Sequence, residues 1–265
     1  MPIFEQDTAA GCWRPSPLAA GPFAGLQGGA VASLLTAEVE LLAASAGWGW
    51  AISVAVWFLK PVPMARLRTE VATLRGGGRV SVVDNTLFAD SDAEPCATAR
   101  VTLIKERRVD TPEIADRRTR PLDPAAYPRR SIASFHGRPW MMDAMDAHAG
   151  EGVAWFRQNV PVLANVPTGT LSSILGPADW AHGISRPLQN VVADPNPNLT
   201  VHMLRPPENG WIGIRPHTWW DPQRGVGIGD GAILDVRGEI GSVSMAVALT
   251  PFPKPATAET ASERA

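Results

Sequence analysis

The stretch VWFLKP at residues 56–61 decides the fold, because it recurs as VHMLRP at residues 201–206. The same spacing of 145 positions (206 − 61) carries Glu94 onto Glu239. Several matches in one register are typical of a structural unit that has been duplicated within a chain. The sequence therefore predicts two halves with a similar fold.

Working outward from this repeat, each half shows one helix followed by strands. In the first half, apolar residues at spacings of three and four predict a helix over residues 28–46, which Gly47 ends. Alternating or apolar stretches then predict strands at residues 51–59, 67–74, 79–88 and 96–104. The second half repeats this order, with a strand at residues 152–160, a helix at about 170–182 and strands at 199–205, 211–218, 225–234 and 241–249.

A long apolar helix followed by an antiparallel meander lets the sheet curl around the helix, and two such units protect their strand edges by pairing edge to edge. The prediction is an α+β protein with a tandem (double) hot-dog fold, in which two antiparallel sheets each wrap around a long central helix. We expect an N-terminal hot-dog at residues 1–107, a linker at 108–149, a C-terminal hot-dog at 150–252 and a flexible tail at 253–265. The linker lacks periodicity and is rich in Arg and Pro.

Composition limits the classes of function. A net charge of −2 provides no basic field for nucleic acid, and 45% hydrophobic residues exclude disorder of the whole chain. The N-terminus does not resemble a signal peptide, and no long uncharged apolar run predicts a membrane span. Cys12 and Cys96 are predicted to be free buried thiols in a cytoplasmic protein. Pairing into a homo-oligomer is left open.

The helix starts and several loop motifs resemble those of the double hot-dog acyl-CoA thioesterases of the thioesterase II type. The matching segments are Gly28-Gly29 and residues 58–61 in the first half, and residues 177–183 (PADWAHG), 196–200 (NPNLT), 204–207 (LRPP), 225–227 (GVG) and 234–235 (LD) in the second. The resemblance covers about residues 10–105 and 150–250. It implies hydrolysis of an acyl-coenzyme A thioester, with coenzyme A as leaving group and no retained cofactor.

The resemblance also implies a hydrolytic water held by an Asp, a Thr or Asn, and a Gln. Asp179 matches the first position and Asn196 the second, although a rigid turn would also explain Asn196. The Gln position falls on Met245 or Ala246, whose side chains donate no hydrogen bond to a water. Loss of such a donor typically costs about 3 kcal/mol of transition-state stabilisation. A non-hydrolytic acyl-thioester binding protein is therefore the alternative function.

Four further residues are predicted to contact the substrate. Gly28 and Gly29 open the first helix, where backbone N–H groups and the helix dipole can polarise a thioester carbonyl. His182 and Trp57 complete the predicted set. Each has a structural alternative: helix-start geometry for the glycines, a pair with Asp179 for His182, and packing on the sheet for Trp57.

Other chemistries find less support in the sequence. The 5 histidines show no metal-ligand spacing on one element, so no metal site is predicted. No Gly-x-Ser-x-Gly motif is present for a serine nucleophile. Glu38, two residues after Thr36 in the first helix, is a secondary acid candidate, with a solvated position as its alternative. A hot-dog enoyl-thioester hydratase or dehydratase is the third functional class, and the paired Asp and His in a loop that it needs are not found.

Overall fold

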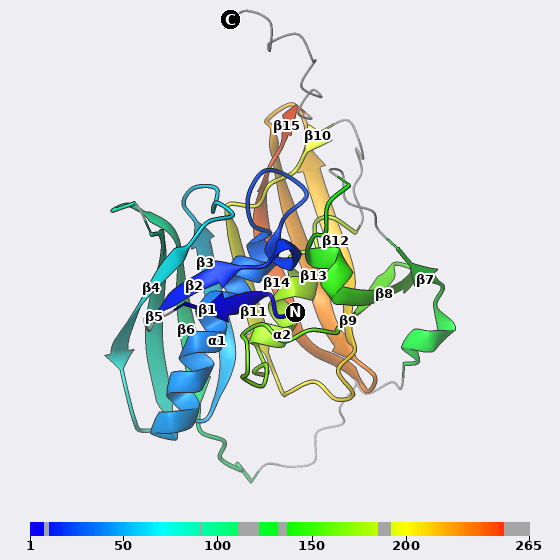
Figure 1. Cartoon of the computed structure of the whole chain (residues 1–265). Helices are drawn as coiled ribbons and strands as arrows, with labels where there is room; N and C mark the ends of the chain where they lie inside the picture. The colour runs from blue at the N-terminus through cyan, green and yellow to red at the C-terminus, as the bar shows by residue number, and fades with distance from the viewer. Residues whose placement is uncertain (8–10, 91, 111–121, 132–136, 185–191, 252–265) are drawn as a thin grey trace, which may run out of the picture.

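The computed structural model describes the chain except for residues 8–10, 91, 111–121, 132–136, 185–191 and 252–265 (Figure 1). One antiparallel sheet of 13 strands runs through the described residues in the order β1-β2-β4-β5-β6-β3-β11-β14-β13-β12-β9-β8-β7. The first half contributes β1 (Phe4–Gln6), β2 (Cys12–Pro15), β3 (Trp50–Phe58), β4 (Leu67–Arg75), β5 (Val80–Ala89) and β6 (Pro95–Ile104). The second half contributes β7 (Arg129–Arg130), β8 (Met145–Gly150), β9 (Val153–Gln158), β11 (Asn198–Met203), β12 (Ile212–Asp221), β13 (Val226–Asp235) and β14 (Gly238–Ala248). A separate small sheet pairs β10 (Val192–Ala193) with β15 (Thr250–Pro251).

The long helix α1 spans Gly28–Ala46, as the apolar spacing predicts. The Gln27 side chain accepts a hydrogen bond from the Ala30 N–H at its start, and Gly47 ends it in the left-handed conformation with φ 63. The helix packs on β3, β5 and β6 and on the second helix, α2 (Ser172–Ala178) (Figure 1). By length and composition α1 would suffice to span a membrane, but 61% of that stretch is buried inside the molecule, as in a core helix.

The second helix is shorter than predicted, so the expected long central helix of the C-terminal half is wrong. Instead of residues 170–182, α2 spans the 7 residues Ser172–Ala178 and contains Pro177. Proline disfavours continuation of a helix, and the chain tightens after it into turns in which the Trp180 N–H donates to the Pro177 carbonyl oxygen. This turn places Asp179 directly at the end of α2.

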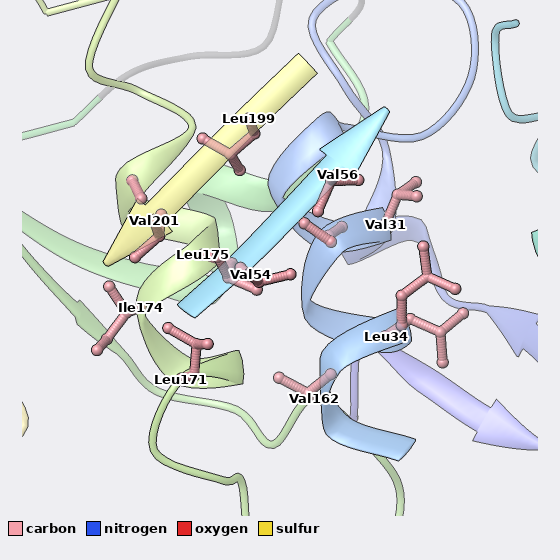
Figure 2. Close-up of a cluster of buried hydrophobic side chains, with 14 of the residues drawn as sticks. Val31, Leu34, Val54, Val56, Val162, Leu171, Ile174, Leu175, Leu199 and Val201 are labelled. Carbon is pink, nitrogen blue, oxygen red and sulfur yellow. The ribbon is translucent and has the colours of Figure 1, made fainter. Parts of the chain in front are cut away.

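The two halves join along β3 and β11, which pair in antiparallel register with Val56 opposite Leu199 and Val54 opposite Val201. The expected edge-to-edge pairing is present, but it makes one continuous sheet rather than two separate ones. Buried side chains from β3, β11, α1 and α2 meet behind this junction (Figure 2). The labelled members are Val31, Leu34, Val54, Val56, Val162, Leu171, Ile174, Leu175, Leu199 and Val201. Both helix ends that form the site below are fixed by this common core.

Several short strands carry no clear signal in the sequence. The stretch expected to be a linker holds β7 and β8, and β8 extends the sheet beside β9. At the N-terminus, the Phe4 N–H donates to the Val162 carbonyl oxygen, so β1 is tied to the second half. Cys12 and Cys96 are free and buried, as predicted. The tail at residues 253–265 lies outside the described residues.

Candidate active site

Asp179 is the C-terminal cap of α2, and its side chain points at the start of α1. The residue is 5% exposed. Its Oδ2 accepts a hydrogen bond of 2.5 Å from Gln27 Nε2, and its Oδ1 accepts one of 2.9 Å from Asn196 Nδ2. The Gly29 backbone N–H donates to the same carboxylate. Three N–H donors, two at the start of α1 and one in the loop before β11, therefore hold this group in one orientation.

Burial dominates the acidity of this carboxylate. Desolvation raises the pKa of Asp179 to about 6, although the hydrogen bonds from Asn196, Gly29 and Gln27 act to lower it. The negative charge of Asp194 is a smaller contribution to the same rise in the pKa. A carboxylate with a pKa near 6 is largely ionised at neutral pH and is more basic than an ordinary aspartate, which suits a general base.

The paired glycines at the start of α1 are required by close approach to Asp179. A Cβ atom on Gly28 would lie 3.0 Å from Oδ1 of Asp179 and 3.1 Å from Cζ of Phe58. A Cβ atom on Gly29 would lie 2.6 Å from the Leu175 carbonyl oxygen. The Gly29 N–H already donates a hydrogen bond to the carboxylate of Asp179. The Gly28 N–H has no acceptor among the described residues and remains available to a ligand at the positive end of the helix.

Gln27 is a site residue that sequence reasoning missed. Its Oε1 accepts a hydrogen bond of 2.8 Å from the Ala30 N–H, which leaves Nε2 directed at Asp179. The signal in the sequence was a polar residue at the capping position directly before Gly28. Met245, one of the two positions where a Gln was expected, is a buried side chain on β14. The residue that caps the first helix therefore supplies an amide donor to the carboxylate, whereas the Gln expected on the last strand was to hold the water.

Asn196 lies in the loop between β10 and β11 and contacts both the carboxylate of Asp179 and its own turn. Its Nδ2 donates to Asp179 and also, over 3.2 Å, to the Asn198 carbonyl oxygen. The second bond fixes the turn, and the first contacts the carboxylate. Because Nδ2 is used in both bonds, the side-chain oxygen is the group that Asn196 can offer to a water or substrate.

A half-open cavity of about 400 Å³ lies in front of the carboxylate. This volume is within the usual range for small-molecule sites. Its walls are largely apolar and include Phe23, Leu26, Val31, Phe58, Val62, Trp180 and Pro197. The polar and charged side chains that line it are Gln27, Lys60, Asp179, His182, Asp194 and Asn196. The arrangement can hold an apolar group beside a polar reacting centre.

The structure brings most of the predicted site residues together. Asp179, Asn196, His182 and Gly28 line this one cavity, and Gly29 donates to the carboxylate at its wall.

The exception is Trp57, which is 47% exposed on β3 and is not among the described residues that line the cavity. Neighbouring strand residues point to opposite faces, so the adjacent Phe58 reaches the cavity instead. The structural alternative for Trp57, packing on the sheet surface, describes its position.

His182 pairs with a different carboxylate from the one expected. Its Nε2 lies 3.8 Å from Oδ2 of Asp194, and both residues are buried. Asp194 follows β10 and was not identified in the sequence, because no motif marks it. The cavity thus contains two carboxylates and one imidazole.

Glu38, the secondary acid candidate, belongs to a bonding network away from this cavity. Its Oε1 accepts hydrogen bonds from Trp13 Nε1 over 2.9 Å and from Thr69 Oγ1 over 2.8 Å. Its Oε2 accepts one of 2.8 Å from Asn85 Nδ2. These bonds tie α1 to the strands of the first half, which is a structural role.

The fold and the cavity define the chain as a hot-dog protein. Solved structures at low sequence identity share this fold, as two examples show. A protein from Alicyclobacillus acidocaldarius with a hot dog fold and unknown function has a TM-score of 0.66 at 16% identity, over 94% of this chain and 96% of its own. The acyl-CoA thioesterase II of Mycobacterium marinum has a TM-score of 0.64 at 15% identity, over 95% and 97%.

Residues 16–104 match the model of the acyl-CoA thioesterase N-terminal domain. Over these residues the chain is similar to the acyl-CoA thioesterases, and the resemblance predicted from the sequence is confirmed. No curated protein matches the sequence. A dehydratase domain from a Brevibacillus brevis polyketide synthase is also similar in structure, with a TM-score of 0.51 at 16% identity over 85% of each chain. The fold alone consequently does not determine the reaction.

Proposed function

We propose that this protein, a tandem hot-dog, hydrolyses an acyl-coenzyme A thioester, with Asp179 as the general base. The observation that carries the proposal is the carboxylate of Asp179, which is 5% exposed and lies at the wall of a cavity of about 400 Å³. Its pKa of about 6 makes it a stronger base than a solvated aspartate and still leaves it ionised at neutral pH.

In the proposed reaction, the carboxylate of Asp179 accepts a proton from a water molecule as the water oxygen attacks the thioester carbonyl carbon. The Asn196 side-chain oxygen helps to orient that water. Negative charge then develops on the carbonyl oxygen, and the free Gly28 N–H at the start of α1 stabilises it. The carbon–sulfur bond breaks, coenzyme A leaves as a thiolate, and the proton on Asp179 returns to solvent or to the thiolate. The products are a free acid and coenzyme A.

Gln27 supports hydrolysis over the alternative of a non-hydrolytic acyl-thioester binding protein. That alternative was motivated by Met245 and Ala246 at the expected Gln position. Since Gln27 Nε2 bonds to Asp179, the site contains an amide donor in spite of those two residues. The argument for a protein that binds acyl thioesters without hydrolysing them is therefore weaker.

The test is release of free thiol from a series of straight-chain acyl-CoAs, from butyryl to palmitoyl. Asp179→Asn should reduce kcat by about a hundredfold or more, as expected for loss of a general base. Asp84→Asn is the matched control, because Asp84 is paired with Arg100 away from the cavity and the charge change is the same. Saturable binding of acyl-CoAs without thiol release would identify a binding protein. Loss of absorbance of a conjugated enoyl thioester without thiol release would identify a hydratase.

A further inference from the structure

We propose that Asp194 is a specificity-determining residue, which makes the cavity reject acyl groups that carry a distal carboxylate. The substrates are then acyl-CoAs with uncharged acyl chains. This inference rests on the proposed function for its substrate class, and it assigns a role to a side chain outside the motifs that the sequence offered.

Asp194 is built into the cavity wall. It is 1% exposed and lines the same cavity as Asp179. The imidazole of His182, which faces it across 3.8 Å, has little freedom to move away. His182 packs closely against β13 at Gly229. A Cβ atom on Gly229 would lie 2.7 Å from Cβ of His182, so this packing requires a glycine at position 229. The His182–Asp194 pair is therefore a fixed part of the site.

The cationic groups in the described lining already face carboxylates of the protein. Lys60 is the one Lys or Arg among the described residues that line the cavity. Its ammonium group is bonded to Asp92, and Glu94 lies 3.8 Å away. His182 faces Asp194. A carboxylate on the acyl chain would thus meet Asp179 and Asp194 in a largely apolar cavity.

Physical chemistry makes this combination strongly unfavourable. A buried anion without a partner loses its hydration, and like charges repel more strongly in a cavity of low effective dielectric constant than in water. An acyl group without a charge has neither cost and gains from the apolar walls. The thioester itself is neutral, so the discrimination acts on the distal end of the acyl chain.

The experiment measures binding of three thioether analogues that cannot be hydrolysed, because the cleavable carbonyl–sulfur linkage is replaced. They correspond to hexanoyl-CoA, glutaryl-CoA and the terminal amide of glutaryl-CoA. The carboxylate analogue should bind about a hundredfold more weakly than the hexanoyl analogue. The amide, which has almost the same shape, should recover most of that loss. Equal affinity of the carboxylate and amide analogues for the wild-type protein would overturn the proposal.

Two variants assign the effect to the cavity charge. Asp194→Asn should narrow the gap between the carboxylate and amide analogues about tenfold, whereas Asp84→Asn should leave it unchanged. Ala248→Lys adds a cation to the cavity lining without altering Asp194 and should also narrow the gap, so the test survives if the Asn variant fails to fold. An unchanged gap in a folded Asp194→Asn protein and in Ala248→Lys contradicts the role of charge.

Hydrolysis of hexanoyl-CoA and glutaryl-CoA is measured separately in the same proteins. If neither substrate is hydrolysed while the binding preference is intact, the proposed function is rejected. The selectivity against charged acyl groups would then still hold. Hydrolysis of both substrates with similar kcat/KM would reject the selectivity alone.

Discussion

Nε2 of Gln27 lies 2.5 Å from Oδ2 of Asp179, although 152 positions separate the two residues in the sequence. Gln27 caps α1 in the first half and Asp179 caps α2 in the second. The hydrogen bond therefore joins the ends of two helices that only the folded chain brings together. It follows that the site is complete only when both halves are folded and docked.

The pH dependence of hydrolysis should follow the ionisation of Asp179. A general base must be a carboxylate, and burial raises the pKa of Asp179 to about 6. We expect log(kcat/KM) for hexanoyl-CoA to rise with a slope of about one below this pKa and to level off above it. A profile that stays flat down to about pH 4.5 would show that no group with this pKa limits the reaction.

Removal of the Gln27 amide should shift the acid limb of this pH profile to higher pH. The bond from Gln27 lowers the pKa of Asp179, so Gln27→Met, which keeps the length of the side chain without a donor, should move the acid limb to higher pH. We also expect kcat to fall by about tenfold. Gln158→Met is the control, because Gln158 donates to the Val160 carbonyl oxygen and does not line the cavity. If kcat falls in the Gln27 variant while the acid limb stays in place, the amide does not act through Asp179.

The sequence predicted the fold well where one pattern dominated the local structure. The bounds of α1 agree with the prediction because apolar spacing, an N-terminal cap and Gly47 all act within one short segment. The end of α2 was missed because Pro177 competes with an apolar pattern that continues beyond it. The strands β7 and β8 were missed because short edge strands owe their form to the neighbouring β9 rather than to their own periodicity.

For the candidate site, motifs identified two residues that line the cavity and missed those that depend on tertiary contact. Asp179 and Asn196 were found through their motifs. Gln27 and Asp194 were missed because their importance arises from which distant residue each one meets. Trp57 was predicted to contact the substrate, but among the described residues Phe58 lines the cavity instead. Both faces of β3 are apolar, so composition alone could not decide which face meets the cavity.

Asp179 should also make stability depend on pH. Its folded pKa of about 6 exceeds the ordinary value of 3.8, so the folded protein binds this proton more tightly than the unfolded chain does. The stabilisation is complete below pH 3.8 and is lost as pH rises through about 6. Relative to Asp179→Asn, the wild-type free energy of unfolding should fall by about 2–3 kcal/mol across this window. Urea unfolding of both proteins at about pH 4 and about pH 7.5 measures the change, and parallel curves would contradict the assignment.

Gly29 should tolerate no side chain. A methyl group there would lie 2.6 Å from the Leu175 carbonyl oxygen and 2.9 Å from Cβ of Asp179, so Gly29→Ala must separate α1 from α2. We expect a loss of about 1–3 kcal/mol in the free energy of unfolding, together with loss of hydrolysis. Gly150→Ala is the matched control, because the nearest atom to its Cβ would be at 3.5 Å, on Tyr127. Equal stability and activity of the two variants would mean that α1 and α2 can accommodate a methyl group where they meet.

Glu40 provides the reciprocal contact between the helices, and its removal should separate stability from catalysis. Asp179 at the end of α2 accepts hydrogen bonds from the start of α1. In turn, Glu40 on α1 accepts hydrogen bonds at the start of α2, from the Leu171 N–H over 2.7 Å and the Ser172 N–H over 3.2 Å. Glu40 does not line the cavity among the described residues. Glu40→Ala should cost about 1–2 kcal/mol of stability, as for loss of a helix cap, and leave kcat/KM within about threefold of the wild-type value. Chemical denaturation and thiol release on one preparation measure both quantities. A catalytic loss larger than the loss of folded protein would show that the two helix contacts act as one unit, because displacement of α2 at its start would then reach Asp179 at its end.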